Sequence, residues 1–551
     1  MRTLQKETSH DSLASSSNAN IYLGRGRFAR SLLAVDGVIR AVGSDEAMAA
    51  CAPAGVEVLN AEGRTAVPAF NDSHCHLLML GRALEDIRLH GTSGIADLKA
   101  RVRRYIAERR PAPGTVLHGM GWNQDYFEDE RRLPTAADLD EAAPDYPLVL
   151  ERACGHILVA STAAMRLAGI TNGTAPLPGG AIDRDGEGRA TGIFRENACA
   201  QVMRILPAPT LESDRRALQA ALRHAAACGI GSAHSMDVRG GNWRDVLALY
   251  RSVLEETPSL RVNHQCCFME ENELADFLAA GNRTGTVAGH AMNRVGPLKL
   301  FVDGSLGART ALLRASYADD PTTSGIGTIE PDMLSRLVTR AVRGGMQSTI
   351  HAIGDGAIER VLNAYEPFCR GGENPLRLGI VHVQITDRPL LERMAAMGVL
   401  AHIQPIFLHY DMHVVCDRVG RALAASSYAF KSMLELGIPT SLGTDCPVED
   451  LNAIDNLYCA VNRRDLSGDS EGQPDGFFAN EKLSIEEAVD AYTAGSAFAS
   501  FEENRKGRLL PGHVADIALL SQDIFSIDPL ALRTTTVDRT IVDGRTVFVR
   551  E

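Results

Sequence analysis

Paired cysteines, long apolar runs and an excess of basic residues are all missing from this sequence. Its 551 residues include 11 cysteines, an odd number without CxxC spacing, which argues against a disulfide framework and a zinc ribbon. No apolar run reaches the ~18 to 20 residues of a membrane-spanning helix, and the polar start lacks the order of a secretory signal. The formal net charge of -13 argues against a broad basic face for nucleic acid or anionic membranes. We therefore expect a cytoplasmic protein with a small-molecule partner, no nucleic acid and no membrane.

Hydrophobic residues at 45% and charged residues at 23% are typical of a globular protein. The polar residues 1–20 are expected to be a loose, disordered tail. Short β-type runs follow in 21–64 and return in 507–551, so we expect both ends to pair into one small β-sandwich domain. The mixed α/β stretch 65–506 is then the catalytic domain.

Strand-like runs alternate with helical stretches in this middle part, which predicts a (β/α)₈ TIM barrel, an α/β fold. The eight predicted barrel strands are Thr65–Phe70, Gly229–His234, Arg261–Phe268, Pro297–Asp303, Met346–Ala352, Leu378–Gln384, Val399–Phe407 and Pro439–Asp445. The first two are too far apart for one crossover, so about 85–205 is expected to be an inserted α/β lobe over the active-site mouth.

The clearest local signal is the pair His74 and His76 at the end of an apolar strand. Side chains alternate along an extended chain, so histidines at i and i+2 point to the same side and can hold one metal ion. Alone, such a pair is weak evidence. Four later strand ends carry Lys299, His351, His382 and Asp445, which converge with the pair at one barrel mouth.

Lys299 needs a separate explanation, because an ammonium group cannot bind a cation and a lysine buried in a strand is costly. If burial lowers its pKa, the free amine can take up CO₂ and form a carbamate that bridges two metal ions. The alternative is an ion pair with Asp303, which shares its face of the strand.

The six residues together resemble the metal site of the amidohydrolase superfamily. The segments Asp303-Gly-Ser-Leu-Gly-Ala-Arg-Thr310, His351-Ala-Ile-Gly-Asp355 and Gly443-Thr-Asp-Cys-Pro-Val448 are similar to amidohydrolase family 3, which includes N-substituted formamide deformylases. The resemblance runs from about 21 to 549. One departure is Asn71 before Asp72, where many relatives have a smaller apolar residue.

The resemblance implies a hydrolase of carbon–nitrogen bonds other than peptide bonds (EC 3.5), acting on an amide such as an N-substituted formamide through a metal-bound hydroxide. It implies two zinc ions, one held by His74 and His76 and the other by His351 and His382, with carboxylated Lys299 as the bridge. Asp445 would lie beside the first ion and carry the proton to the leaving amine. The residue types suit iron, manganese or cobalt as well as zinc. By the same resemblance a homodimer is expected.

Several other residues are candidates for substrate binding. Trp122, Asp125 and His156 lie in the predicted lobe, with His156 also a catalytic candidate, and Gln404 lies on the seventh strand. Packing is the alternative for Trp122. Gln404, Asp303 and Asp355 are also candidates to orient the metal ligands, with structural hydrogen bonding as the alternative.

Two other functions fit parts of the pattern. A mononuclear deaminase on the same fold would use the same histidines and Asp445 but would not need Lys299. A non-catalytic scaffold would be expected to lose ligands, whereas this chain has all six.

Overall fold

The computed structural model describes residues 13–16, 19–53, 56–89, 91–124, 127–152, 157–177 and 180–551. They divide into two compact units. Unit 1 comprises Met1–Leu77 and Leu222–Glu551, and unit 2 is Leu78–Ala221, inserted between the two parts of unit 1. The helices α2 (Leu77–Glu85) and α7 (Leu211–Ala227) contain the two boundaries.

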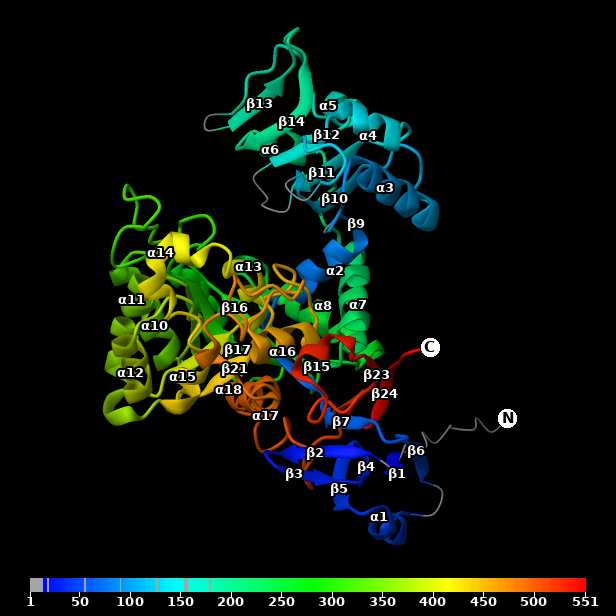
Figure 1. Ribbon diagram of the computed structural model, residues 1–551, viewed down its shortest axis with the longest axis vertical. Coiled ribbons are helices and arrows are strands. Elements are labelled where there is room, and N and C mark those ends of the chain that lie inside the picture. Colours follow the sequence, from blue (N-terminus) through cyan, green and yellow to red (C-terminus); the bar gives the residue numbers. More distant parts are fainter. Residues whose placement is uncertain are drawn as a thin grey trace. The chain divides into compact units, whose positions relative to one another are not determined.

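Unit 1 contains the predicted barrel, a sheet of eight parallel strands in chain order (Figure 1). The strands are β8 (Phe70–Cys75), β15 (Ile230–Ser235), β16 (Arg261–Cys267), β17 (Asn293–Phe301), β18 (Ser348–Ala352), β19 (Gly379–His382), β20 (Leu400–Ile403) and β21 (Thr440–Leu442). Two backbone hydrogen bonds join the last strand to the first: the Asp445 N–H donates to the His74 carbonyl at 2.8 Å, and the His76 N–H donates to the Cys446 carbonyl at 2.7 Å. The predicted TIM barrel is confirmed.

The first predicted barrel strand, Thr65–Phe70, was placed too early. Its residues Thr65–Pro68 form β7, which pairs with terminal strands outside the barrel. The chain passes from one sheet to the other at Ala69, whose N–H donates to the Asp516 carbonyl, and the barrel strand begins at Phe70. Both segments are apolar and buried, so the sequence reads as one continuous strand.

Helices surround the barrel and follow most of its strands (Figure 1). They are α8 (Trp243–Glu256), α9 (Glu271–Ala279), α10 (Pro331–Arg343), α11 (Asp355–Tyr365), α12 (Arg388–Met397), α13 (Leu408–Asp411), α14 (Val415–Ala424), α15 (Phe430–Glu435), α16 (Ala453–Asn462), α17 (Ile485–Asp490) and α18 (Ser496–Ala499). Local sequence explains α12: the Asp387 side chain accepts from the Leu390 N–H at the start, and Gly398 ends the helix at φ 63°. Within the described ranges, no helix combines the length and apolarity needed to cross a membrane.

Unit 1 has two further sheets; both ends of the chain contribute to the six-stranded one, and the four-stranded one is formed by N-terminal strands. Blue and red strands lie side by side in Figure 1. The six-stranded sheet has the order β24 (Arg545–Val549), β23 (Val537–Val542), β22 (Ile517–Leu520), β7, β2 (Asn20–Gly24) and β3 (Arg27–Ala29). The four-stranded sheet has the order β5 (Val38–Gly43), β4 (Ser31–Val35), β1 (Leu13–Ser16) and β6 (Glu57–Asn60), with α1 (Asp45–Cys51) between β5 and β6 in the chain.

The predicted disordered tail, 1–20, contains two segments that form strands. Leu13–Ser16 is strand β1, which pairs with β4 on one side and with β6 on the other. Asn20 begins β2. Backbone pairing needs no apolar side chains, which is why a polar sequence concealed this strand. Residues 1–12 and 17–18 of the predicted tail lie outside the described residues.

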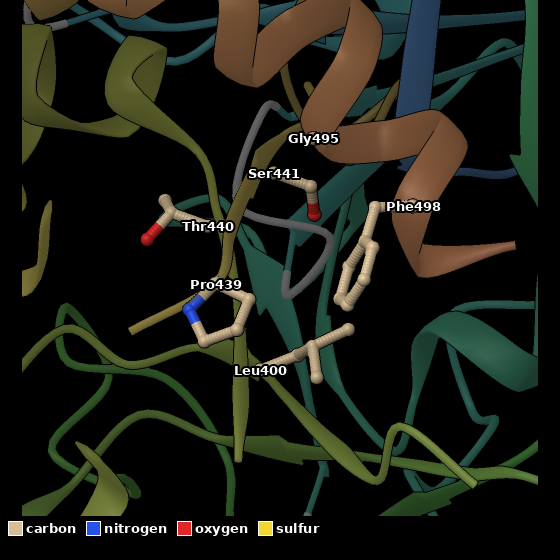
Figure 2. Close-up of a pocket in the computed structure, with 6 residues that line it drawn as sticks. All are labelled: Leu400, Pro439, Thr440, Ser441, Gly495 and Phe498. Carbon is tan, nitrogen blue, oxygen red and sulfur yellow. The ribbon is translucent and has the colours of Figure 1, made fainter. Parts of the chain in front are cut away.

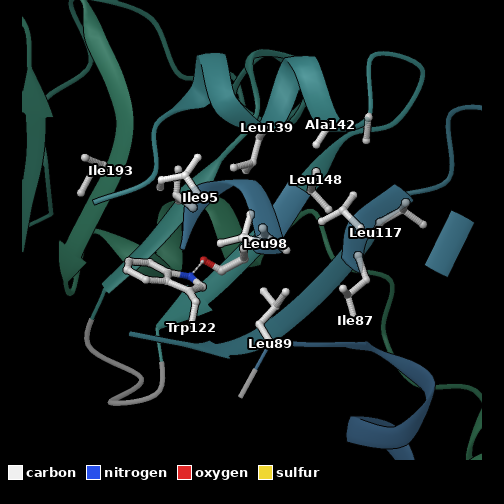
Figure 3. Packing of buried hydrophobic residues seen from close by; sticks show 14 of the residues in the cluster. Ile87, Leu89, Ile95, Leu98, Leu117, Trp122, Leu139, Ala142, Leu148 and Ile193 are labelled. Atoms are coloured by element: carbon white, nitrogen blue, oxygen red, sulfur yellow. Dashed lines mark hydrogen bonds between the residues drawn. The ribbon is translucent and has the colours of Figure 1, made fainter. Parts of the chain in front are cut away.

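Unit 2 is an α/β lobe with its own sheet, and it extends beyond the predicted 85–205 at both ends. The strand order is β13 (Gly180–Arg184), β14 (Ala190–Glu196), β12 (Ile157–Ala160), β11 (Leu148–Arg152), β10 (Leu117–Trp122) and β9 (Ile87–Arg88). Its further helices are α3 (Ile95–Arg109), α4 (Ala136–Ala142), α5 (Thr162–Leu167) and α6 (Cys199–Met203). Figure 3 shows its core, where Trp122 packs among Leu98, Leu139 and Ile95.

Candidate metal centre

The six predicted ligands all lie in unit 1, at the carboxyl ends of barrel strands. His74 is in β8 with His76 just after it, Lys299 is in β17, His351 is in β18, His382 ends β19, and Asp445 follows β21. The carboxyl ends of parallel strands form the mouth at which TIM barrels carry their active sites.

The Asp445 carboxylate is the point on which three of the histidines converge. Its Oδ1 lies 2.9 Å from His76 Nε2 and 3.2 Å from His74 Nε2, and its Oδ2 lies 3.9 Å from His382 Nε2. One ligand atom from each of His74, His382 and Asp445 lies within 4.8 Å of the others, and all three residues are buried. This spacing is suited to a shared metal ion.

The second ring nitrogen of each paired histidine faces a hydrogen-bond acceptor. His76 Nδ1 lies 3.3 Å from the Met236 carbonyl oxygen, and His74 Nδ1 lies 2.5 Å from Gln265 Oε1. Both oxygens can only accept, so each Nδ1 is placed to donate to its oxygen, in the tautomer that leaves the Nε2 lone pair on the side of Asp445. Burial lowers the pKa of His74 to about 4, which keeps this ring neutral near pH 7. A lone pair and a carboxylate oxygen repel each other unless a cation lies between them, so this donor set fits a divalent metal.

His351 continues the cluster. Its ring lies 4.4 Å from the His382 ring between centroids, and its Nε2 lies 3.0 Å from the Gly304 carbonyl oxygen and 3.2 Å from Asp303 Oδ1. Because both partners of Nε2 accept, the neutral ring leaves its lone pair on Nδ1. Asp303 is held in turn by the backbone N–H groups of Leu312, Ile353 and Gly354. It therefore contacts a predicted ligand, as the sequence suggested.

Lys299 is completely buried, and its Nζ has no hydrogen-bond partner. The ammonium group lies 4.0 Å from the centre of the Phe301 ring, and that ring lies 5.4 Å from the His351 ring. Burial lowers the pKa of Lys299 to about 8, against the opposing charge of Asp445. The ion pair with Asp303, which was the alternative explanation for this lysine, is not formed.

Two of the predicted ligands have unusual backbone conformations. His382 has φ 85° and Asp445 has φ 58°, in a region that residues other than glycine seldom occupy. Such strain persists only where surrounding contacts enforce it, and it is concentrated at functional sites.

Asp72 joins the elements that carry the paired histidines and Asp445. Its buried carboxylate accepts from the His74 N–H at 3.1 Å, the Thr444 hydroxyl at 2.8 Å, the Thr444 N–H at 3.3 Å and the Tyr492 hydroxyl at 3.1 Å. Sequence reasoning noted this aspartate but gave it no role. An acidic residue next to paired histidines in an apolar strand was the available signal.

The other predicted site residues have separate positions. Trp122 is fully buried, and its Nε1 donates to the Leu150 carbonyl at 3.0 Å within the core of unit 2 (Figure 3). Gln404 follows β20 and donates to the His402 carbonyl, and its Oε1 has no partner. Asp355 pairs with Arg314 at 3.0 Å instead of with a site imidazole. The remaining two candidates, Asp125 and His156, lie outside the described residues.

A separate cavity of about 200 Å³ lies at the other end of the barrel. Figure 2 shows Leu400, Pro439, Thr440 and Phe498 around it, and its other lining residues are Ser441 and Gly495. These residues begin β20 and β21 or lie in the segment around α18, whereas the predicted ligands are at the strands' carboxyl ends. The cavity is therefore distinct from the candidate metal centre.

Known proteins resemble this chain over nearly its whole length. The amidohydrolase family model matches residues 57–548. YtcJ of Bacillus subtilis (strain 168) is 32% identical over 519 residues, covering 93% of this chain and 94% of that protein. N-substituted formamide deformylase of Arthrobacter pascens is 26% identical over 544 residues, covering 96% of each. A solved structure, an uncharacterized metal-dependent hydrolase from Pyrococcus furiosus, matches with a TM-score of 0.74 and 29% identity, covering 94% of this chain and 100% of that chain.

A parallel eight-stranded barrel with histidines and an aspartate at its strand ends defines the class of TIM-barrel, metal-dependent hydrolases. The chain belongs to the amidohydrolase family, whose model spans most of the sequence. The family resemblance inferred from the motifs is confirmed.

Proposed function

We propose that this protein hydrolyses a carbon–nitrogen bond of a small-molecule amide (EC 3.5) at a centre of two zinc ions. The single observation that carries the proposal is the convergence of His74, His76 and His382 on Asp445. In His74 and His76, the Nδ1 atom on the other side of the ring faces a hydrogen-bond acceptor. N-substituted formamides are the first candidate substrates, because the Arthrobacter pascens relative has that activity in its name.

His74, His76 and Asp445 would hold one ion, and His351 and His382 the other. Bound zinc supplies Lewis acidity, which lowers the pKa of water and polarises a substrate carbonyl. The acceptors on His74, His76 and His351 direct the lone pairs of these rings toward the centre, and burial excludes bulk water.

Asp445 would move the proton that the reaction requires. The attacking water forms a new C–O bond and loses a proton to the carboxylate, and Asp445 returns this proton to the amide nitrogen as the C–N bond breaks. The products are a carboxylic acid and an amine. For an N-substituted formamide these would be formate and a primary amine.

Lys299 would bridge the two ions as a carbamate. Its neutral Nζ would attack the carbon of CO₂, forming an N–C bond and releasing one proton, and the two new oxygens would become ligands. The support is its complete burial without a partner, in electrostatic contact with Asp445, His74 and His382. An ammonium group there makes no hydrogen bond, and the Phe301 ring and the charge of Asp445 offset its burial only in part, whereas a carbamate would also be bound to metal.

Other parts of the proposal rest on the sequence. Gln404 is the substrate contact that we retain, because its free Oε1 follows β20 on the same edge as the ligands. Asp125 and His156 stay predictions, and Trp122 is better explained by packing. The cytoplasmic location, the small-molecule partner and the homodimer also stay predictions.

Hydrolysis before and after metal removal tests the proposal. We expect the purified protein to release an amine and formate from N-substituted formamides, to lose this activity after dialysis against dipicolinate, and to recover it with zinc. Hydrolysis by fully metal-depleted protein would contradict the proposal. Release of ammonia from amino-substituted rings, without amide cleavage, would favour the mononuclear deaminase instead.

A further inference from the structure

Gln265 is a buried residue of β16 that contacts the first of the paired histidines. Its Oε1 lies 2.5 Å from His74 Nδ1, and its Nε2 donates to the Ser73 carbonyl at 3.0 Å. The two ends of one amide group therefore hold two successive residues of β8.

These two contacts fix the orientation of the amide and, through it, the tautomer of His74. The Ser73 carbonyl can only accept, so the NH₂ end of Gln265 must face it and Oε1 must face the imidazole. Oε1 also can only accept, so His74 Nδ1 must carry the proton. The lone pair of the neutral ring is then on Nε2, on the side of Asp445.

The contact also holds an irregular part of the barrel wall. In the pairing of β15 with β8, Ala233 is opposite Asp72 and Ser235 is opposite Cys75, so Ser73 and His74 together are opposite one residue. This is a β-bulge, which leaves one residue without its regular partner and redirects a side chain. Gln265 lies beyond β15, on β16, and reaches across the barrel interior to the bulge.

We propose that Gln265 is a positioning residue for metal binding: it clamps the bulge at Ser73 and His74 and holds the His74 imidazole with its Nε2 lone pair directed at the metal centre. The inference rests on the proposed function, since it concerns the affinity of the same site. It adds a residue that touches neither the ion nor the substrate.

Zinc affinity of matched variants tests this role. The Gln265→Met variant keeps the approximate side-chain volume but removes both contacts. We expect its dissociation constant for zinc to rise about 10- to 100-fold, as measured by competition with a chromogenic chelator. The Gln265→Glu variant keeps an acceptor for His74 Nδ1 but loses the donor to Ser73. It should recover most of the zinc affinity while its metal-free form melts at a lower temperature.

Gln347 provides the control, because it is equally buried in the barrel but donates to the carbonyls of Arg377 and Ala499, away from the ligands. The Gln347→Met variant should lose thermal stability and keep its zinc affinity. Wild-type affinity in Gln265→Met, or an equal loss in both methionine variants, would overturn the positioning role and leave the proposed function intact. Absence of zinc binding in the wild-type protein would overturn both.

Discussion

A neutral imidazole binds a metal in a defined direction only when its other nitrogen is held by an acceptor. In this protein the acceptors are of three kinds: a backbone carbonyl for His76, an amide oxygen for His74, and a carboxylate with a carbonyl for His351. For these three histidines the hydrogen-bond partners specify which nitrogen is left for the metal. The orientation of these three predicted ligands is thus built into the apoprotein, whereas Nδ1 of the fourth histidine, His382, is buried without a partner.

At Trp122 the structure predicts a loss of stability on substitution. The Trp122→Phe variant removes the hydrogen bond to Leu150 and part of the ring from a full core, which should cost about 1 to 3 kcal/mol in free energy of unfolding. Urea unfolding measures this cost. Trp243→Phe is the matched control, since that indole donates at 3.3 Å to the exposed Asp276, and it should cost less. An unchanged stability with a raised KM in Trp122→Phe would instead assign the indole to the substrate.

His118 gives unit 2 a pH-dependent contribution to stability. Burial opposes its charge, but hydrogen bonds of 2.7 Å to both Asp86 and Glu151 outweigh burial and raise the pKa of His118 to about 9. A raised folded-state pKa stabilises the protein fully below the ordinary value of about 6.5, and this stabilisation disappears as the pH rises through about 9.

The His118→Gln variant should therefore be less stable than the wild type at pH 6, by about 1 to 2 kcal/mol after allowance for partial exposure, and should approach it at pH 9.5. Unfolding curves of both proteins across this range measure the difference. If the difference in free energy of unfolding between the two proteins were the same at every pH, the charge of His118 would contribute nothing to stability.

At the scale of elements, Asp72 connects three parts of unit 1. Its hydrogen bonds join β8, the segment after β21 and Tyr492 in the π-helix Ala491–Gly495. The Asp72→Ala variant would leave buried donors unsatisfied at about 1 to 3 kcal/mol each. We expect it to lower the melting temperature and the zinc affinity together, because the paired histidines and Asp445 lose their common support.

The Tyr492→Phe variant removes only one of these bonds and keeps the aromatic ring that packs 5.3 Å from the Phe70 ring of β8. It should lower the melting temperature slightly and leave zinc affinity unchanged. Calorimetry with a zinc titration separates the two readouts. An Asp72→Ala protein that binds zinc as tightly as the wild type would show that the strands hold the ligands without this carboxylate.

The sequence predicts the positions of strands better than it predicts which sheet they join and which side chains come into contact. Runs of apolar residues located seven of the eight barrel strands, because buried parallel strands are nearly continuous in apolar residues. The same rule misassigned Thr65–Pro68, which is just as buried in another sheet. Nothing in the sequence indicated a role for Gln265. Its contact with His74 depends on the bulge in β8 and joins two strands that are separated by β15 in the barrel.

At the scale of the molecule, a buried arginine of the barrel forms ion pairs with two aspartates next to strands of the terminal sheet. Arg261 of β16 lies 2.7 Å from both Asp516 and Asp543, which precede β22 and follow β23. The β-texture at both ends predicted that the termini would come together. It did not predict this ion pair, whose partners are more than 250 residues apart in the chain.

The predicted ligands follow the order of the barrel strands, and this is why their convergence could be predicted from the sequence. Each predicted ligand lies near the carboxyl end of a barrel strand, and parallel strands bring those ends to one edge of the barrel. The clustering of His74, His382 and Asp445 is what this topology predicts. The partners that orient the ligands come from unrelated positions, such as Met236 and Gln265, and required the structure.

The central claim, a two-metal centre bridged through Lys299, is tested most directly by metal content per chain. Wild type, Lys299→Met and Lys506→Met would be expressed with zinc and bicarbonate and measured by elemental analysis. Lys506 is the matched control, a buried lysine paired with Glu502 at 2.7 Å. We predict about two ions in the wild type and in Lys506→Met, and one or none in Lys299→Met. One ion in all three proteins would contradict the bridged centre and favour a mononuclear enzyme.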